Sequence, residues 1–261
     1  MYTQGNTILI TGGGSGIGLA LARRFVRHNN RVIICGRDEA KLAAARQTMP
    51  NLETKRCDVS IQCDRDELVQ WTLDHFPSLN IVINNAGILN VIDVATESFD
   101  FTAIEQELRT NLYAPIDLTL RFLPHLRQQL SAAIVNISSG LVYSPAAIAP
   151  IYATTKAGVH AFTQTIRYQL RDTRLKVFEV FPPTVDTKLN ADIQVNKISP
   201  HAAAEAIVQG IAKDTQDIRV GQVKALYIAT RIAPTFINNK INEVIAQGQQ
   251  QSRNGNAGKD S

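Results

Sequence analysis

Short apolar stretches rich in β-branched residues alternate along the chain with longer stretches of helical periodicity. The apolar stretches predict strands at 7–11, 31–35, 52–57, 80–84, 132–137 and 176–181. The stretches between them predict helices over 17–28, 39–48, 63–76, 102–129 and 152–171. This alternation is typical of βαβ units, in which right-handed helical crossovers join parallel strands. Because the strands are almost continuously apolar, helices are expected to cover both faces of the sheet.

The ends of the elements carry weaker signals. Thr102 and Glu105 have the spacing of a capping box at a helix start, and Ser199 before Pro200 predicts the start of a later helix. Residues 188–199 read as a loop, and 218–245 fit either a final strand or further helices. The polar segment 248–261 is expected to be a disordered tail. We therefore predict a single domain over 1–247.

Composition excludes several classes of protein. The 261 residues are 44% hydrophobic and 19% charged, which suits one large α/β domain with a full core. The net charge is +4, but Lys and Arg are scattered, without the basic and aromatic clusters of nucleic-acid binders. The three cysteines have no metal-site or disulfide spacing, and no signal peptide or membrane-length apolar run is visible. We expect a cytoplasmic protein without a metal, a membrane span or a nucleic-acid partner.

A glycine-rich turn, "TGGGSGIG", stands between the first predicted strand and the first predicted helix. Gly12, Gly16 and Gly18 set its spacing. Glycines at such a turn allow the backbone to approach a pyrophosphate, while the helix N-terminus faces the anion. The alternative is a turn with a purely structural role.

Tyr152 and Lys156 lie four residues apart in "PIYATTKAG", so a helix places them on one face. An ammonium group beside a phenol favours the phenolate and lowers its pKa, so Tyr152 is a candidate for proton transfer. The alternative is an ordinary polar pair on a helix surface.

Together these motifs resemble the short-chain dehydrogenases/reductases over about residues 5–190. The resemblance rests on "TGxxxGIG" at 11–18, "NNAG" at 84–87, Asn111, the Ser139, Tyr152 and Lys156 spacing, and a Pro182–Thr187 segment. It implies a doubly wound Rossmann-type sheet of order 3-2-1-4-5-6-7, an NAD(P) cofactor and hydride transfer between nicotinamide and a carbonyl or alcohol. It also implies that Tyr152 is the acid/base, that Ser139 polarises the substrate oxygen, and that Lys156 and Asn111 complete a proton relay.

The resemblance also implies a set of cofactor-binding residues along the carboxyl ends of the strands. They are Gly12, Ser15, Gly16, Ile17, Gly18, Arg37, Asp58, Val59, Asn85, Ala86, Gly87, Tyr152, Lys156, Pro182, Val185 and Thr187.

Asn111 is also singled out by its neighbours. Pro115, four residues later, has no N–H to bond the Asn111 carbonyl, so that carbonyl needs another partner, such as water. The alternative is a proline kink whose carbonyl faces solvent.

The cofactor preference depends on the tip of the second strand. Gly36 stands where relatives that prefer NAD place an aspartate, and Arg37 follows it with donors suited to a 2′-phosphate. Asp38 is then placed to cap the helix that begins at Glu39. We predict NADP(H) over NAD(H). The alternative is that Arg37 points to solvent and Asp38 binds the ribose.

Two features depart from the family pattern. Pro183 stands where the family usually has a glycine. The C-terminus lacks the paired glycines of many family members, which are often buried in a tetramer interface. Their absence favours a homodimer through the helices over 102–129 and 152–171. The stretches "VIICGRDEAKL" and "PPTVDT" resemble the branch of the family that is encoded beside teichoic-acid D-alanylation genes.

Two other functions remain open alongside an NADP(H)-dependent oxidoreductase that acts on an apolar carbonyl or alcohol. One is a cofactor-binding sensor or scaffold on the same fold. The other is a lyase-type relative that has lost the cofactor.

Overall fold

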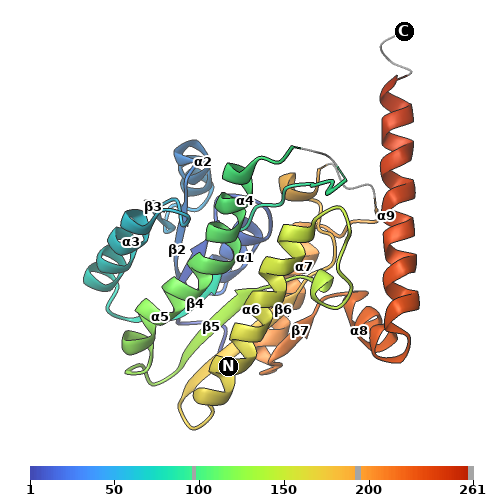
Figure 1. Cartoon of the computed structure of the whole chain (residues 1–261). Coiled ribbons are helices and arrows are strands. Elements are labelled where there is room, and N and C mark those ends of the chain that lie inside the picture. The colour runs from blue at the N-terminus through green and yellow to red at the C-terminus, as the bar shows by residue number, and fades with distance from the viewer. Residues whose placement is uncertain (96–97, 192–194, 258–261) are drawn as a thin grey trace.

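The computed structural model describes residues 1–95, 98–191 and 195–257, with side chains described as far as residue 247. Within these residues, seven parallel strands form one sheet of order β3-β2-β1-β4-β5-β6-β7, with helices on both faces (Figure 1). The strands are β1 (Thr7–Thr11), β2 (Arg31–Gly36), β3 (Glu53–Arg56), β4 (Leu79–Asn84), β5 (Ala132–Ile137), β6 (Leu175–Phe181) and β7 (Asp217–Arg219). The predicted doubly wound sheet is confirmed.

The α-helices follow the predicted alternation. They are α1 (Gly16–Arg27), α2 (Glu39–Thr48), α3 (Gln62–His75), α4 (Phe101–Leu108), α5 (Ala114–Leu126), α6 (Pro150–Gln169), α7 (Pro200–Ala212), α8 (Val223–Ile232) and α9 (Pro234–Ala257). Two short 3₁₀ turns, η2 (Gly140–Val142) and η3 (Lys188–Asn190), follow β5 and β6. Within the described residues, no helix combines the length and the hydropathy of a membrane span.

The helix predicted over 102–129 is interrupted. A π-helical turn, η1 (Arg109–Tyr113), separates α4 from α5, and the Ala114 N–H donates to the Arg109 carbonyl five residues earlier. Pro115 follows at the start of α5 and has no N–H for the ordinary helix bond to Asn111. The wider turn therefore lies where the proline prevents regular α-helical bonding.

The starts of α4 and α7 test the capping residues predicted from the sequence. Asp100 is the N-cap of α4 and accepts a hydrogen bond from the Ala103 N–H at 3.0 Å, so the capping box expected from Thr102 is wrong. The helix begins two residues earlier than the box requires, because the Asp100 carboxylate supplies the acceptor. Ser199 is confirmed as the N-cap of α7 and accepts from the Ala202 N–H at 3.1 Å.

The ambiguous segment 218–245 contains the end of β7, all of α8 and the first half of α9. α9 stands along one side of the molecule and extends beyond it (Figure 1). The backbone of α9 is helical as far as Ala257. The polar composition instead predicts a disordered tail from residue 248. Good helix formers such as Gln can sustain local helical bonding there. Residues 258–261 lie outside the described residues, and the division into a domain over 1–247 and a tail stays a prediction.

The sheet separates two apolar cores. Ile8 and Ile10 of β1 point to the face covered by α1 and α7, and Leu9 between them points to the face covered by α3, α5 and α6. Side chains along a strand alternate between its faces, so an apolar strand supplies both cores at once. Burying each such side chain stabilises the fold by about 1.5–3 kcal/mol, and the carboxyl ends of the strands are held rigidly as a result.

Candidate active site

The glycine turn after β1 is packed against the loop that follows β4. Gly12 and Gly16 have φ of +65° and +53°, a conformation that favours glycine. A Cβ on Gly18 would lie 2.5 Å from both the Gly12 carbonyl oxygen and Asn85 Nδ2. A side chain at Gly18 would therefore separate α1 from the two loops.

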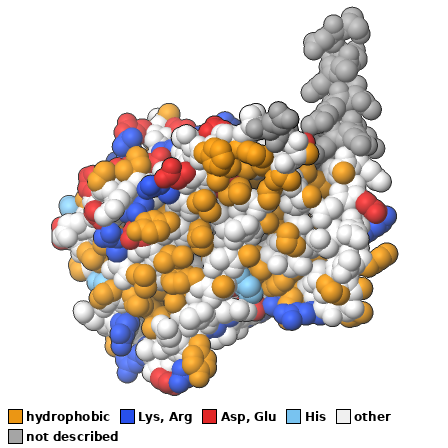
Figure 2. All heavy atoms as spheres, viewed as in Figure 1, with side chains coloured by type: hydrophobic (Ala, Val, Ile, Leu, Met, Phe, Trp, Pro, Cys, Tyr) orange, Lys and Arg blue, Asp and Glu red, His pale blue; other side chains and the backbone are white. Residues whose placement is uncertain are grey.

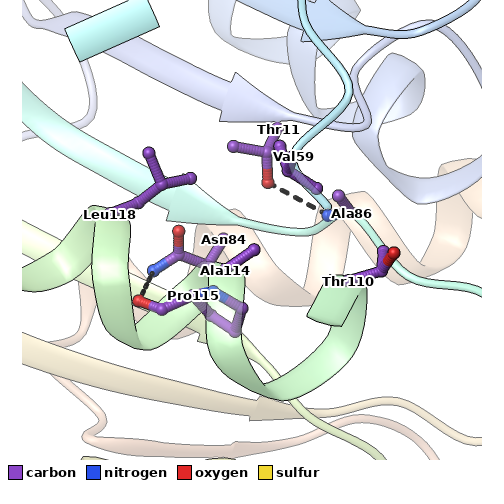
Figure 3. Close-up of a pocket in the computed structure, with 8 residues that line it drawn as sticks. All are labelled: Thr11, Val59, Asn84, Ala86, Thr110, Ala114, Pro115 and Leu118. Atoms are coloured by element: carbon purple, nitrogen blue, oxygen red, sulfur yellow. Dashed lines mark hydrogen bonds between the residues drawn. The ribbon is translucent and has the colours of Figure 1, made fainter. Parts of the chain in front are cut away.

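Asn85 and Thr11 join these two loops. Asn85 Nδ2 donates to the carbonyls of Thr11 and Gly12 at 2.9 and 3.2 Å. The N–H groups of Asn85 and Ala86 both donate to Thr11 Oγ1 at 3.0 Å. Figure 3 shows the bond from Ala86. The ends of β1 and β4 thus form one unit at the point where the strand order reverses, which is where open α/β sheets bind ligands.

A cleft of about 1070 Å³ opens along the carboxyl ends of the strands. Its volume is at the upper end of the usual range of about 300–1,000 Å³ for ligand sites, which leaves room for a dinucleotide and a substrate. The cleft brings together most of the predicted site: Gly12, Ser15, Gly16, Ile17, Arg37, Asp58, Val59, Asn85, Ala86, Gly87, Ser139, Tyr152, Lys156, Pro182, Val185 and Thr187. Gly18 and Asn111 are buried and do not line the cleft.

The amino end of α1 offers a cradle for an anion. Its N-cap, Ser15, makes no side-chain capping bond within the described residues, so first-turn N–H groups remain for a ligand. A Cβ on Gly16 would lie 3.0 Å from Thr187 Cγ2, which places the segment between β6 and η3 directly against the turn. The cleft residues therefore fit a dinucleotide.

Figure 3 shows a second cavity, between β4 and α5, where Asn84 Nδ2 donates to the Pro115 carbonyl at 3.4 Å. Its volume is only about 10 Å³, close to the room that one water needs. It is too small for a cofactor or a substrate.

Ser139 and Tyr152 meet in the cleft from different elements. Ser139 follows β5, and its Oγ accepts from the Leu141 N–H at 3.1 Å. Tyr152 lies in the first turn of α6 and is buried, and the nearby Ser139 hydroxyl favours its charged form. Burial raises the pKa of Tyr152 to about 12, against the lowering effect of Ser139; the negative charge of Glu107 raises it further.

Lys156 is buried one turn further along α6. Its Nζ donates to the Ile137 carbonyl at 2.8 Å and lies 5.5 Å from the centre of the Tyr152 ring. Burial lowers the pKa of Lys156 to about 8, and the charges of Glu179 and Glu107 act in the opposite direction. The expectation that Lys156 lowers the pKa of Tyr152 below its ordinary value is wrong for this structure, because desolvation of the phenol outweighs the groups that favour its charged form.

The Asn111 side chain has a role that the sequence did not reveal. Its Oδ1 accepts from the Ile88 N–H at 2.9 Å, and its Nδ2 donates to the Ile88 carbonyl at 2.7 Å. A Cβ on Gly87 would lie 3.4 Å from Asn111 Oδ1 and 3.9 Å from Lys156 Nζ. Asn111 therefore holds the loop after β4 beside Lys156, while its proposed part in a proton relay stays a prediction.

Glu107 is a buried group that sequence reasoning missed. Its Oε2 accepts from Asn90 Nδ2 at 2.9 Å and from the Asn90 N–H at 3.3 Å. Burial raises the pKa of this carboxyl, while Asn90 and the charge of Lys156 lower it. The sequence signal that could have identified Glu107 is its position four residues before Asn111, one helical turn away.

At the tip of β2, Asp38 is confirmed as the N-cap of α2. Its carboxylate accepts from the Lys41 N–H at 3.1 Å and forms an ion pair with the Lys41 ammonium, which lowers the pKa of Asp38. Arg37 is exposed at the cleft, and Lys41 also lines it. Two cations therefore stand beside Gly36, and the Asp38 charge is already engaged by α2.

The comparisons with known proteins agree with this geometry. Residues 6–198 match the family model described as short chain dehydrogenase. The chain is 43% identical over 237 residues to the uncharacterized oxidoreductase DltE of Bacillus subtilis, a match that covers 88% of this chain and 94% of that protein.

Two solved structures share the fold at low sequence identity. A short chain dehydrogenase from Burkholderia cenocepacia in complex with NADP has a TM-score of 0.82 at 20% identity, covering 92% of this chain and 98% of that one. A relative from Burkholderia phymatum in complex with NAD also has a TM-score of 0.82, at 21% identity over 92% and 97% of the two chains. The chain thus belongs to the short-chain dehydrogenase family, in its DltE-like branch.

Proposed function

We propose that this protein is an NADP(H)-dependent oxidoreductase that acts on a carbonyl or alcohol. The bound nicotinamide would supply the hydride chemistry, and the protein would supply the proton, the position and the electrostatics. The observation that carries the proposal is the buried pair of Ser139 and Tyr152, which line the same cleft as the glycine turn.

Tyr152 is the proposed general acid in reduction and the general base in oxidation. Ser139 would donate its hydroxyl hydrogen bond to the substrate oxygen and polarise it. Lys156, with a pKa of about 8, would still be largely protonated at neutral pH. Its positive charge would favour the phenolate form of Tyr152 in the transition state, where the proton leaves the phenol.

NADP(H) is the proposed cofactor, in preference to NAD(H). The support is local: Arg37 and Lys41 line the cleft beside Gly36, and Asp38 is engaged as the cap of α2. A 2′-phosphate would meet the Arg37 guanidinium here, whereas the Asp38 carboxylate is already engaged by the N–H and the ammonium of Lys41.

We also propose a cytoplasmic homodimer that uses α4, α5 and α6. These helices, and the η1 turn between α4 and α5, expose large apolar side chains, including Phe101, Tyr113, Leu120 and Tyr168. Figure 2 shows hydrophobic side chains among charged ones across this face. Burying such side chains against a second copy would remove apolar surface from water.

The test is a panel of aldehydes and ketones, assayed by the oxidation of NADPH. Tyr152→Phe should abolish turnover and leave cofactor affinity nearly unchanged, because only the proton donor is lost. Tyr2→Phe is the control, since Tyr2 is 83% exposed and does not line the cleft. If the protein binds NADPH but reduces no carbonyl in the panel, a cofactor-binding sensor would replace the oxidoreductase. If Tyr152→Phe keeps most of the wild-type kcat, the acid is misassigned.

A further inference from the structure

α9 forms an outer wall of the substrate half of the cleft. Its side chains Ile241, Val244 and Ile245 line the cleft, together with Lys240. A single residue, Ala233, separates α9 from α8, and α8 contributes Leu226 to the same cleft. The C-terminal segment that departs from the family pattern therefore lies at the site.

Two asparagines of α9 bind this wall to the loop between β5 and α6, residues 138–149. The Ser144 hydroxyl donates to Asn238 Oδ1 at 2.9 Å. The Ala147 N–H donates to Asn242 Oδ1 at 2.7 Å, and Asn242 Nδ2 donates to the Pro145 carbonyl at 3.2 Å. These bonds join segments more than ninety residues apart in sequence.

The spacing of Asn238 and Asn242 explains why α9 has a fixed position relative to the 138–149 loop. Asn238 and Asn242 are one helical turn apart, so both face the 138–149 loop. Asn242 uses its oxygen and its nitrogen on the same loop, which fixes both the position and the rotation of α9 about its axis. The loop also contains Ser139, so α9 is connected to a residue of the proposed active site.

The lining of this half of the cleft is predominantly apolar. Its apolar side chains come from the 138–149 loop, η3, α8 and α9, and include Leu141, Ala146, Ile148, Leu189, Leu226, Ile241, Val244 and Ile245. The acidic residues that line the cleft within the described chain, Asp38 and Asp58, follow β2 and β3 at the glycine-turn side. This wall therefore favours an uncharged aliphatic group over a cation.

We propose that α9 sets the substrate specificity, and that the substrate is a carbonyl or alcohol with an aliphatic chain. The reacting oxygen lies at Ser139 and Tyr152, and the chain runs outward between the 138–149 loop and α9. This inference rests on the proposed function for the reaction, and on the α9 contacts for the shape of the substrate. Asn238 and Asn242 are positioning residues, and Ile241 is a specificity residue.

Turnover of a homologous series tests the wall. We expect kcat/KM to rise from butanal to octanal, by up to about fourfold for each methylene that becomes buried. Ile241→Ser should lower kcat/KM for octanal by about tenfold and change butanal by less than about twofold, because only the longer chain reaches α9. Ile232→Ser is the matched control, since Ile232 is 79% exposed at the end of α8 and does not line the cleft. Equal losses for both aldehydes would overturn the inference.

Binding tests the same wall without turnover. 1-Octanol should bind the NADP⁺-loaded protein more tightly than 1-butanol in isothermal titration, and Ile241→Ser should remove most of that difference. Octanol that binds no tighter than butanol overturns the chain site, whatever the activity. A chain-length effect on binding, without reduction of any carbonyl, supports the chain site and rejects the proposed oxidoreductase.

Asn242→Ala tests the hydrogen bonds between α9 and the 138–149 loop. Asn239→Ala is the control, since Asn239 lies on the same helix and is exposed. Asn242→Ala should raise KM for octanal several-fold, leave kcat for butanal nearly unchanged and leave NADPH affinity unchanged. A fall in kcat for both aldehydes with no change in KM would contradict a positioning role for α9.

Discussion

The Lys156 ammonium lies 5.5 Å from the centre of the Tyr152 ring and donates its hydrogen bond to the Ile137 carbonyl. The two side chains are therefore neighbours on one face of α6, but the lysine is held by the end of β5. Burial acts on them in opposite directions, since it raises the pKa of Tyr152 to about 12 and lowers the pKa of Lys156 to about 8. Each residue is thus biased toward its neutral form.

This bias makes stability depend on pH through Lys156. The folded pKa of about 8 lies below the ordinary 10.5, so between these values the unfolded chain binds more protons than the folded one. The free energy of unfolding should therefore rise with pH across this window, by on the order of 3 kcal/mol from this group. Lys156→Met should remove that rise. Denaturant unfolding of both proteins from pH 7 to about pH 11 measures the difference; parallel curves would show that Lys156 titrates normally.

Pro115→Ala should restore an N–H that can bond the Asn111 carbonyl and so displace a relay water from it. We expect slower proton transfer, seen as a changed solvent isotope effect on kcat. The reason is that regular α-helical bonding would replace the π-helical turn at 109–113. Stability should change by less than about 1 kcal/mol, since Pro115 lies in the first turn of α5. An unchanged rate and isotope effect would remove the proline from the mechanism.

Gly36 and Arg37 should set the cofactor preference. Arg37→Ala should weaken NADP(H) binding by about 1.5–3 kcal/mol, a factor of about ten to a hundred, because one charge-assisted bond to a phosphate is lost. Gly36→Asp should shift the preference toward NAD(H), and the new side chain has room, since a Cβ there meets only Leu42 Cδ2 at 3.9 Å. Isothermal titration with both cofactors measures the change. Tighter binding of NAD(H) by the wild type would reverse our assignment.

Gly18→Ala should destabilise the protein and weaken cofactor binding. The added methyl would lie 2.5 Å from Asn85 Nδ2 and the Gly12 carbonyl, so α1 or the loop after β4 must shift. We expect a loss of about 1–3 kcal/mol in the free energy of unfolding. Gly36→Ala is the matched control for stability, because its methyl has ordinary van der Waals contact. Equal melting temperatures for the two variants would show that the close approach at Gly18 is unimportant.

Local patterns determined most of the sheet and the elements beside it. The strand predicted at 7–11 coincides with β1, and the helix at 39–48 with α2, because strand alternation and helix capping act within a few residues. Asp38 was identified as a cap for the same reason. The capping box at Thr102 failed because a competing acceptor, Asp100, lay just upstream.

The sequence also predicted which residues line the cleft. The glycine turn and Ser139 follow parallel strands, Tyr152 and Lys156 lie one turn apart on α6, and the fold brings them to one cleft. Only the tertiary structure decided how these groups are charged and held. The pKa of Tyr152 depends on the surroundings that bury it, and the Asn111 side chain bonds Ile88, twenty-three residues away.

The C-terminal segment shows most clearly which features the sequence determined and which the tertiary structure decided. Its apolar positions indicated a strand or helices, but not the surface that they would cover. The contacts of Asn238 and Asn242 with the 138–149 loop join residues more than ninety positions apart, and such contacts leave no periodicity in the sequence. Desolvation and long-range hydrogen bonds depend on which segments meet in space, so the substrate wall was decided by the tertiary structure alone.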